Sequence, residues 1–157
     1  MAKEIERKFL VSGDFRSASA GVERIVQGYL CSDPARTVRV RIKGQRAFLT
    51  IKGRSTADGL SRYEWEKEIQ VAEAEELLKL CERGVIEKDR YMVPVQGHVF
   101  EVDVFYGENQ GLVMAELELS DESESFHRPE WLGDEVTGDL RYYNSMLGNK
   151  PYTKWNK

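Results

Sequence analysis

The stretch Thr37–Lys43, TVRVRIK, decides how the fold is read, because charged and apolar side chains alternate along it without a break. In an extended chain successive side chains point to opposite faces, so the basic residues share one face and the branched apolar residues share the other. Such a segment is typical of a β-strand that separates an apolar core from a polar environment. The other segments of the chain indicate whether that environment is bulk water or an enclosed interior.

The same alternation recurs along most of the chain, in short segments punctuated by Gly, Pro or Asp. We expect about eight strands with mostly short connections, which is typical of an antiparallel meander. Eight strands are also a natural number for closing a small barrel, which removes the exposed sheet edges. The expected strands are Glu4–Val11, Glu23–Leu30, Thr37–Lys43, Ala47–Lys52, Arg62–Val71, Ile86–Val95, His98–Phe105 and Val113–Ser120.

Two segments have the periodicity of helices. Ala72–Glu82 consists largely of strong helix formers, and its apolar residues recur at helical spacing. Gly138–Leu147 places Leu140, Tyr143 and Leu147 on one face of a helix. We expect both helices to pack against the outside of the sheet.

The distribution of charge between strands indicates where the polar faces point. A solvated outer face is the commonest environment for charged alternation, but such a surface mixes both signs. Here the strand that begins at Thr37 is uniformly basic, whereas the strand with Glu116 and Glu118 is acidic. The expected helices also need apolar sheet surface to cover. We therefore predict a mainly β (α+β) fold, an eight-stranded antiparallel β-barrel tunnel with a charged lumen and helices packed outside.

Composition restricts the class of protein. With 157 residues and no linker or repeat, the chain is expected to form a single domain over residues 1–157. A net charge of −4 argues against a nucleic-acid partner. No stretch approaches the ~20 apolar residues of a membrane span. Cys31 and Cys81 form no CxxC pair, which favours a reducing compartment. We expect a cytoplasmic protein without a membrane or nucleic-acid partner.

A lumen of this composition has a definite chemistry. Arginine and lysine side chains neutralise and orient phosphate oxygens. Carboxylates without histidine or cysteine favour hard divalent cations, Mg²⁺ or Mn²⁺, over zinc. The two sets together predict a polyphosphate site that carries out phosphoryl transfer, in which positioning and charge neutralisation dominate catalysis.

The charged residues also occur in the order of a known family. The opening E-I-E-R-K, residues 4–8, resembles the ExExK signature of the CYTH, or triphosphate tunnel metalloenzyme, superfamily. The family's further elements follow in its order: QGYL, the RxR pair in TVRVRIK, LTIKG, SRYEWE, EKDRY, EVDVF and AELEL. TGDLRYYN, near the end, resembles a C-terminal motif of short bacterial members. The resemblance covers nearly the whole chain, and it implies an eight-stranded tunnel that binds a triphosphate and uses a divalent metal.

The resemblance and the strand pattern together assign roles to the charged residues. We expect the metal to be held by Glu4, Glu6, Asp103, Glu116 and Glu118. We expect the triphosphate to be bound by Lys8, Arg39, Arg41, Lys52, Arg62, Lys88, Arg90 and Arg141. The expected catalytic residues are Lys8, Tyr29, Lys52, Glu64 and Glu66.

These assignments have structural alternatives. Any single glutamate is also explained as a salt-bridge partner in the lumen, and Asp103 as the counter-ion of an arginine. Glu68 continues the parity of Glu66, so Glu66 and Glu68 are an alternative functional pair. Arg141 is also explained as a charge on a helix surface. The residues left without a role are Lys43, Arg54, His98 and His127.

We therefore expect a metal-dependent triphosphatase, an enzyme that releases the terminal phosphate of a small-molecule triphosphate, with tripolyphosphate as the first-choice substrate. Within the family, the alternatives are a thiamine triphosphatase and a class IV adenylate cyclase. An alternative of another class is a non-catalytic polyphosphate- or nucleotide-binding module. The resemblance is also compatible with a homodimer.

Overall fold

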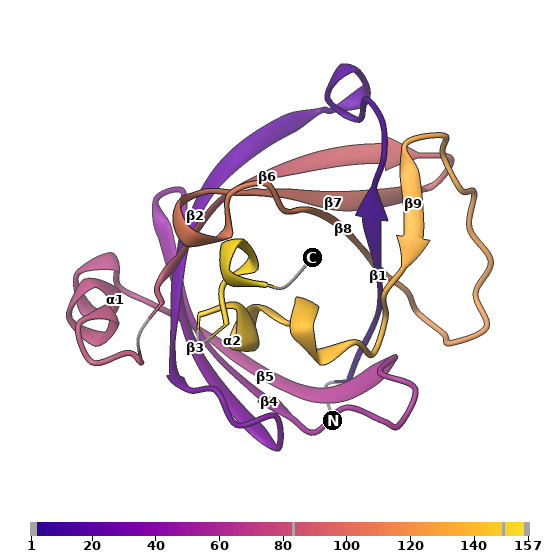
Figure 1. Cartoon of the computed structure of the whole chain (residues 1–157). Coiled ribbons are helices and arrows are strands. Elements are labelled where there is room, and N and C mark those ends of the chain that lie inside the picture. Colours follow the sequence, from indigo (N-terminus) through magenta and orange to yellow (C-terminus); the bar gives the residue numbers. More distant parts are fainter. Residues whose placement is uncertain (1–2, 83, 149, 156–157) are drawn as a thin grey trace.

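A computed structural model describes residues 3–82, 84–148 and 150–155. Strands follow one another around the sheet in the order β5-β4-β3-β2-β6-β7-β8-β1, and pairing of β1 with β5 closes the sheet into a barrel (Figure 1). The strands of the barrel are β1 (Lys3–Val11), β2 (Gly21–Cys31), β3 (Arg36–Lys43), β4 (Arg46–Gly53), β5 (Ser61–Ile69), β6 (Ile86–Val95), β7 (His98–Phe105) and β8 (Val113–Glu118). The predicted eight-stranded barrel is confirmed.

All neighbouring strands are antiparallel, but the chain does not follow a simple meander. β1 pairs with β5 and β8, and β2 pairs with β6 rather than with β1. The connections after β1 and β5 are long enough to leave the edge of the sheet, whereas a two-residue turn, Gly44–Gln45, joins β3 to β4. A short ninth strand, β9 (Leu132–Glu135), pairs with β1 outside the closed ring, and its sequence has no alternation that would predict it.

The barrel is inverted, with charged side chains inside and apolar side chains outside. Along β1, Lys8 lines the interior cavity, while Phe9, its neighbour, is fully buried in an apolar cluster on the outer face. Inside, the register aligns Arg39 of β3 with Thr50 of β4, and Thr50 with Glu66 of β5. These three side chains are hydrogen bonded in a row, 3.1 Å from Arg39 Nη2 to Thr50 Oγ1 and 2.6 Å from Thr50 Oγ1 to Glu66 Oε2.

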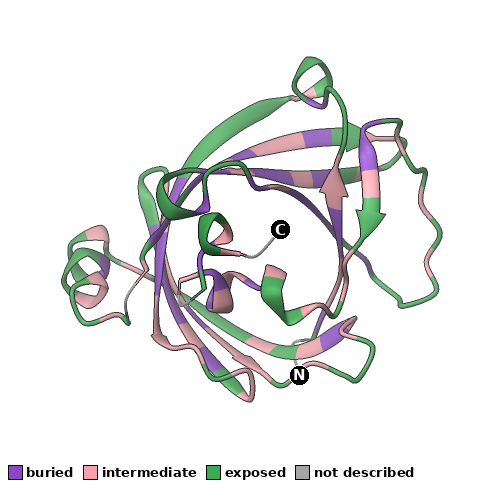
Figure 2. Cartoon of the chain, viewed as in Figure 1, coloured by how far each residue is buried: buried purple, intermediate pink, exposed green. Residues whose placement is uncertain are grey.

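Because the lumen is charged, the main apolar core lies outside the barrel. Phe9, Phe100 and Leu117 project from the outer faces of β1, β7 and β8 into a cluster that a long connection and β9 cover with Trp131 and Leu132. Burial of each such side chain contributes roughly 1.5–3 kcal/mol. Figure 2 shows this difference between walls, since β6, β7 and β8 carry many buried positions and β5 few.

The first predicted helix packs outside the barrel, as expected. α1 (Val71–Leu78) contacts β2, β3 and β4, and its Ala74 forms an apolar cluster with Val40 and Ala47 (Figure 1). The helix begins in a capping box, in which the side chain of Gln70 and that of Glu73 each bond the other's backbone N–H. No helix among the described residues is both long and apolar enough to cross a membrane.

The second predicted helix is wrong in length and in position. Gly138–Leu147 forms two short turns, a 3₁₀ turn over Leu140–Tyr142 and α2 (Asn144–Leu147), instead of one helix. Figure 1 shows this segment within the ring of strands rather than outside it. Leu147 is fully buried in a cluster with apolar residues at the end of the lumen, namely Ile86, Phe105, Leu112 and Met114. The C-terminal segment therefore covers one end of the barrel.

Close backbone contact fixes this cover in place. A Cβ atom added at Gly59 would lie 2.4 Å from Cα of Gly138, which is closer than real Cβ contacts. Gly59 also has a φ of +78° and Gly138 a φ of +85°, in the left-handed region that glycine adopts without strain. The connection between β4 and β5 thus holds the start of the C-terminal segment by a contact that only glycine permits.

We predict that Gly59→Ala destabilises the fold more than Gly97→Ala. Both glycines have positive φ, +78° and +85°, but nothing lies within 4 Å of a Cβ atom at Gly97. Gly97→Ala should cost about 1–2 kcal/mol from backbone strain alone. Gly59→Ala should cost roughly 1–3 kcal/mol more, because the added methyl group displaces the Gly138 backbone. Urea unfolding of the two variants measures this difference, and equal losses would contradict the packing of the cover.

Candidate functional site

The lumen encloses a cavity of about 220 Å³. All of its described lining residues are charged, polar or tyrosine. Seven are basic and seven are acidic, so the wall has no net formal charge. The basic residues are Lys8, Arg39, Arg41, Lys43, Lys52, Arg62 and Arg90, and the acidic ones are Glu4, Glu6, Glu64, Glu66, Glu101, Glu116 and Glu118.

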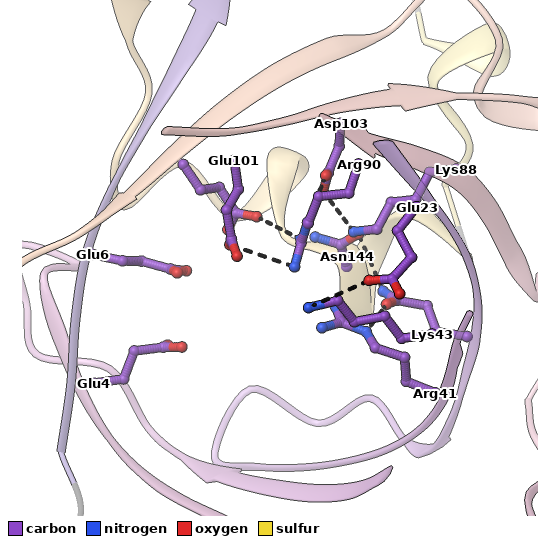
Figure 3. A network of polar contacts seen from close by, with 12 residues as sticks. Glu4, Glu6, Glu23, Arg41, Lys43, Lys88, Arg90, Glu101, Asp103 and Asn144 are labelled. Atoms are coloured by element: carbon purple, nitrogen blue, oxygen red, sulfur yellow. Dashed lines mark hydrogen bonds and ion pairs between the residues drawn. The ribbon is translucent and has the colours of Figure 1, made fainter. Parts of the chain in front are cut away.

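The two signs occupy different parts of the wall. Figure 3 shows Glu4 and Glu6 of β1 reaching into the lumen from one side, opposite Arg41 and Lys43 of β3. The strand register adds acidic residues beside β1, since Glu6 pairs with Glu118 of β8. A molecule in the cavity would therefore meet Arg41 and Lys43 on one side and a group of carboxylates on the other, with Lys8 and Lys52 placed among these carboxylates.

On the basic side, positive charge is incompletely compensated. Among the described residues, the Arg41 guanidinium has one side-chain partner, the neutral Oε1 of Gln27, at 2.7 Å. Burial, together with the nearby Arg39 and Arg90, lowers the pKa of Arg41 to about 9. The buried Nε atoms of Arg39 and Arg62 have no hydrogen-bond partner within residues 3–82, 84–148 and 150–155. An anion in the cavity would satisfy these groups, because each arginine offers up to five donors.

On the acidic side, lysines neutralise some carboxylates. Lys8 Nζ lies 2.6 Å from Glu6 Oε1 and 2.7 Å from Glu116 Oε2, and Lys52 Nζ lies 2.8 Å from Glu4 Oε2. Burial acts to raise the pKa of Glu116, but Lys8 and nearby cations hold that pKa well below its usual range.

Some carboxylates on this side, including Glu6, still repel the carboxylates beside them. Burial and the neighbouring Glu116 raise the pKa of Glu6 to about 7. Burial and Glu4 also raise the pKa of Glu64, and burial, Glu4 and Glu64 raise that of Glu118. Mutual repulsion of this kind favours a bound cation.

The donor set of this acidic wall fits a hard divalent cation. Its ligands are all carboxylate oxygens, and no histidine or cysteine is among the described lining residues. No three acidic, histidine or cysteine side chains of the described chain converge on one point in this conformation. A cation would therefore have to draw carboxylates such as Glu4 and Glu6 away from Lys52 and Lys8.

The cavity brings together most of the residues that the sequence predicted for the site. The predicted residues that line it are Glu4, Glu6, Lys8, Tyr29, Arg39, Arg41, Lys52, Arg62, Glu64, Glu66, Arg90, Glu116 and Glu118. Of the alternative acidic pairs, Glu64 and Glu66 line the cavity. Glu68 instead pairs with the exposed Arg46 at 2.7 Å and is not among the lining residues.

Three predicted residues lie elsewhere. Asp103 is buried behind the wall, where Arg90 donates two hydrogen bonds to it at 2.8 and 2.9 Å and Lys88 pairs with it at 2.8 Å. Its position is that of a counter-ion, the alternative given above for this residue. Lys88 is fully buried beside it and is not a lining residue. Arg141 is exposed and paired with Asp139 at 2.7 Å, so the structure does not bring it to the cavity.

The structure also adds lining residues that sequence analysis missed. Lys43, which the sequence left without a role, lies in the wall because it continues the parity of Arg39 and Arg41. The alternation along this strand is the signal from which the inward position of Lys43 could have been predicted. The other additions are Thr37, Thr50, Glu101, Tyr143, Asn144 and Ser145. The last three come from the C-terminal segment, whose place in the lumen no strand pattern indicates.

Comparison with known proteins places this architecture in a family. The model of the CYTH domain matches residues 2–146. The chain belongs to the CYTH domain family. An inorganic triphosphatase of Acetivibrio thermocellus is 52% identical over 159 residues, covering 100% of both chains, and one of Nitrosomonas europaea is 38% identical over 149 residues, covering 92% of this chain and 95% of the relative.

A crystal structure of an inorganic triphosphatase resembles this CYTH protein throughout. The two have a TM-score of 0.67 and 36% sequence identity over 94% of this chain and 95% of the other. The two proteins therefore share the overall fold over nearly their whole lengths.

We predict that Asp103 is a structural counter-ion and that Asp103→Asn unfolds more easily even when metal is removed by EDTA. Its loss leaves Arg90 and Lys88 buried without their carboxylate, which should cost about 3–5 kcal/mol. Glu101→Gln is the matched control. Glu101 lies 3.4 Å from Arg90 with a side chain 34% exposed, and its loss should cost less than about 1 kcal/mol. A metal ligand would show the opposite pattern, namely little loss in EDTA.

The pH dependence of the stability lost in Asp103→Asn follows from the direction in which the pKa of Asp103 is shifted. Burial acts to raise the pKa of Asp103, but Arg90 and Lys88 lower it below 3.8. The carboxylate therefore contributes stability fully above its unfolded pKa and loses it as pH falls through the lower folded pKa. The difference in unfolding free energy between wild type and Asp103→Asn should shrink below about pH 4, and it should also decrease as pH rises toward the pKa of Lys88, which burial lowers to about 7 even with Asp103 beside it.

Proposed function

We propose that the protein hydrolyses inorganic tripolyphosphate in the lumen cavity, with the help of a divalent cation. The observation that carries this proposal is the opposition of two incompletely compensated charge sets across one cavity. Among the described residues, Arg39 and Arg41 lack full partners on the basic side, and Glu6 and Glu118 repel their neighbours on the acidic side. Arg62, which the strand register sets beside Glu4, also has an Nε atom without a partner in this part of the chain. A polyphosphate with a divalent cation would complete both sets at once. The names of the two bacterial relatives support the same activity.

The polar lining favours an inorganic triphosphate over a nucleotide or thiamine derivative. A base or thiazole ring needs an apolar or aromatic surface, and such ligands occupy pockets of roughly 300–1,000 Å³. This cavity measures about 220 Å³, and its described lining residues include no apolar side chain and only the aromatic rings of Tyr29 and Tyr143. Cation–π contacts already use the Tyr143 ring, which lies 5.3 Å from Lys8 Nζ and 5.6 Å from the Arg62 guanidinium carbon.

The basic wall binds and orients the substrate. Arg39, Arg41 and Arg62 present donors that lack partners in the described part of the protein, and planar guanidinium groups match phosphate oxygens in pairs. Arg90 lies beside them but is held by Asp103 and Glu116, so its orientation is fixed before the substrate arrives. Fixed donors of this kind stabilise charge that develops in the transition state without reorganisation.

The acidic wall would hold the cation, Mg²⁺ or Mn²⁺, through Glu4, Glu6, Glu116 and Glu118. When bound, such an ion neutralises phosphate charge and lowers the pKa of a coordinated water. We assign Glu64 the role of general base, which accepts the proton of the attacking water. Burial and Glu4 raise the pKa of Glu64 and so make it a better base near neutral pH. The water oxygen bonds to the terminal phosphorus, the phosphoanhydride bond breaks, and pyrophosphate leaves. Lys52, 3.8 Å from Glu64, is placed to offset the charge on the leaving group.

The first test is phosphate release by the purified protein with Mg²⁺, with Mn²⁺ and with EDTA. Tripolyphosphate, ATP and thiamine triphosphate are compared, and the products are resolved. We expect orthophosphate and pyrophosphate from tripolyphosphate, with a metal requirement and at least tenfold less turnover of the other two. Cyclic AMP from ATP would indicate a cyclase. Binding of tripolyphosphate without turnover would indicate a binding module, and either result would overturn the proposal.

A pair of arginine variants separates the basic wall from general charge effects. Arg39→Ala should lower kcat/KM for tripolyphosphate by roughly 10- to 100-fold, the loss expected when a hydrogen bond to a charged group is removed. Arg46→Ala removes an exposed arginine whose partner is Glu68, and it should leave kcat/KM within about twofold, as surface pairs contribute little. Equal effects of the two substitutions would mean that the lumen does not bind the substrate.

Glu6→Gln tests the acidic wall, because it separates binding from turnover. In EDTA, tripolyphosphate should bind this variant at least as tightly as the wild type, since a carboxylate that repels the polyanion has been removed. With Mg²⁺ or Mn²⁺, turnover should fall by at least about 100-fold, because a cation ligand is lost. Calorimetric titration in EDTA and phosphate release with metal measure the two quantities. Near-normal turnover would show that Glu6 does not hold the cation.

A further inference from the structure

A chain of buried polar contacts runs behind the cavity and passes through the C-terminal segment. Arg41 Nε donates to Gln27 Oε1 at 2.7 Å, and Gln27 Nε2 donates to Asn144 Oδ1 at 3.2 Å. Lys88 Nζ donates to the same Asn144 oxygen at 2.8 Å and pairs with Asp103, which binds Arg90. Figure 3 shows Asn144 between the Lys88 and Arg41 side chains. Two arginines of the basic wall are thereby connected through one residue of α2.

The direction of every amide in this chain is fixed from both ends. Arg41 and Lys88 have donors only, so each must meet an acceptor. Arg41 therefore takes the oxygen of Gln27 and turns the amide nitrogen of Gln27 toward Asn144. Lys88 and Gln27 both donate to Asn144, so its oxygen must face them. Reversal of the Asn144 amide would place its NH₂ group against two donors.

The Asn144 amide nitrogen is left as an unused donor at the cavity. Asn144 lines the cavity, and its Nδ2 has no hydrogen-bond acceptor among the described residues. Neighbouring donors on the wall, such as Arg41, are cationic, whereas this donor is neutral and is held by two buried partners that are both 0% exposed, Gln27 and Lys88. A donor whose direction is fixed in advance costs little entropy when an acceptor arrives.

We propose that Asn144 binds the substrate, donating its side-chain N–H to a phosphoryl oxygen at the covered end of the barrel, with Gln27 and Lys88 as positioning residues. The inference rests on the proposed function, because it takes the triphosphate as the acceptor. It gives the C-terminal segment a second role beyond closing the lumen. The segment places a neutral donor among the arginines, where it contacts a phosphate oxygen without adding charge.

The competing explanation is that Asn144 only stabilises the fold, and two substitutions separate the alternatives. Asn144→Asp keeps the oxygen that Gln27 and Lys88 need, and replaces the N–H that faces the cavity by a carboxylate oxygen. The buried network is retained, but the substrate meets repulsion instead of a donor. Asn144→Ala removes both the donor and the acceptor, so binding and stability should fall together.

The experiment measures unfolding by urea, tripolyphosphate binding by calorimetric titration in EDTA, and KM and kcat with Mg²⁺. For Asn144→Asp we expect an unfolding midpoint equal to or above that of the wild type, tripolyphosphate binding at least about tenfold weaker, and a similar rise in KM. Asn109→Asp is the matched control. Asn109 accepts a hydrogen bond from the Tyr152 N–H at 2.9 Å and so also contacts the C-terminal segment, but it does not line the cavity. This variant should bind tripolyphosphate within about twofold of the wild type.

The outcomes distinguish this inference from the proposed function. Binding by Asn144→Asp within about twofold of the wild type would overturn the inference and leave the proposed function standing. Equal losses in Asn144→Asp and Asn109→Asp would also overturn it, because the effect would then be a general one of charge near the segment. Failure of the wild type to bind or cleave tripolyphosphate would instead remove the proposed function on which the inference rests.

Discussion

Enclosure of charged side chains in a barrel is the constraint on which the rest of the structure depends. An ion that leaves water costs several kcal/mol unless it is paired, so a lumen of charges is stable only when opposite signs face each other. The wall meets this requirement in part. Lys8 bridges Glu6 and Glu116, and Asp103 holds Lys88 and Arg90, but among the residues that the structure describes Arg41 has only a neutral side-chain partner. The charges that remain unmatched define what the cavity can bind.

The inversion of the barrel also determines where the protein obtains its stability. Because the lumen holds charged side chains, the apolar side chains of the strands point outward and must be covered from outside. Two different parts of the chain cover them. α1 covers the outer faces of β3 and β4, while β9 and the connection that precedes it cover those of β1, β7 and β8. These outer clusters compensate for a wall whose like charges repel one another when no ligand is present. Stability and ligand binding are thus assigned to opposite faces of the same strands.

Strand parity predicted this division from the sequence, because a residue's face follows directly from its position in an alternating segment. Together with the family resemblance, it predicted thirteen residues that line the cavity, among them Arg39 and Glu64. Parity gives the face of a residue but not its depth along the barrel axis or the neighbours that enclose it. Asp103 and Lys88 lie on the predicted face yet are enclosed behind the wall, and Glu68 lies beyond the cavity beside Arg46. Depth depends on the stagger of all eight strands, which no single segment encodes.

The C-terminal segment shows a second limit of local pattern. Leu140, Tyr143 and Leu147 fit one face of a helix, but the chain forms two short turns at the end of the lumen instead. The side chains of this segment lie in two different parts of the lumen, one apolar and one charged. Leu147 enters the apolar end with Ile86 and Met114, whereas Asn144, three residues earlier, reaches the charged part beside Lys88. A segment that spans the boundary between the two regions must carry residues of both kinds, and this requirement explains why neither a helical nor a strand period describes it.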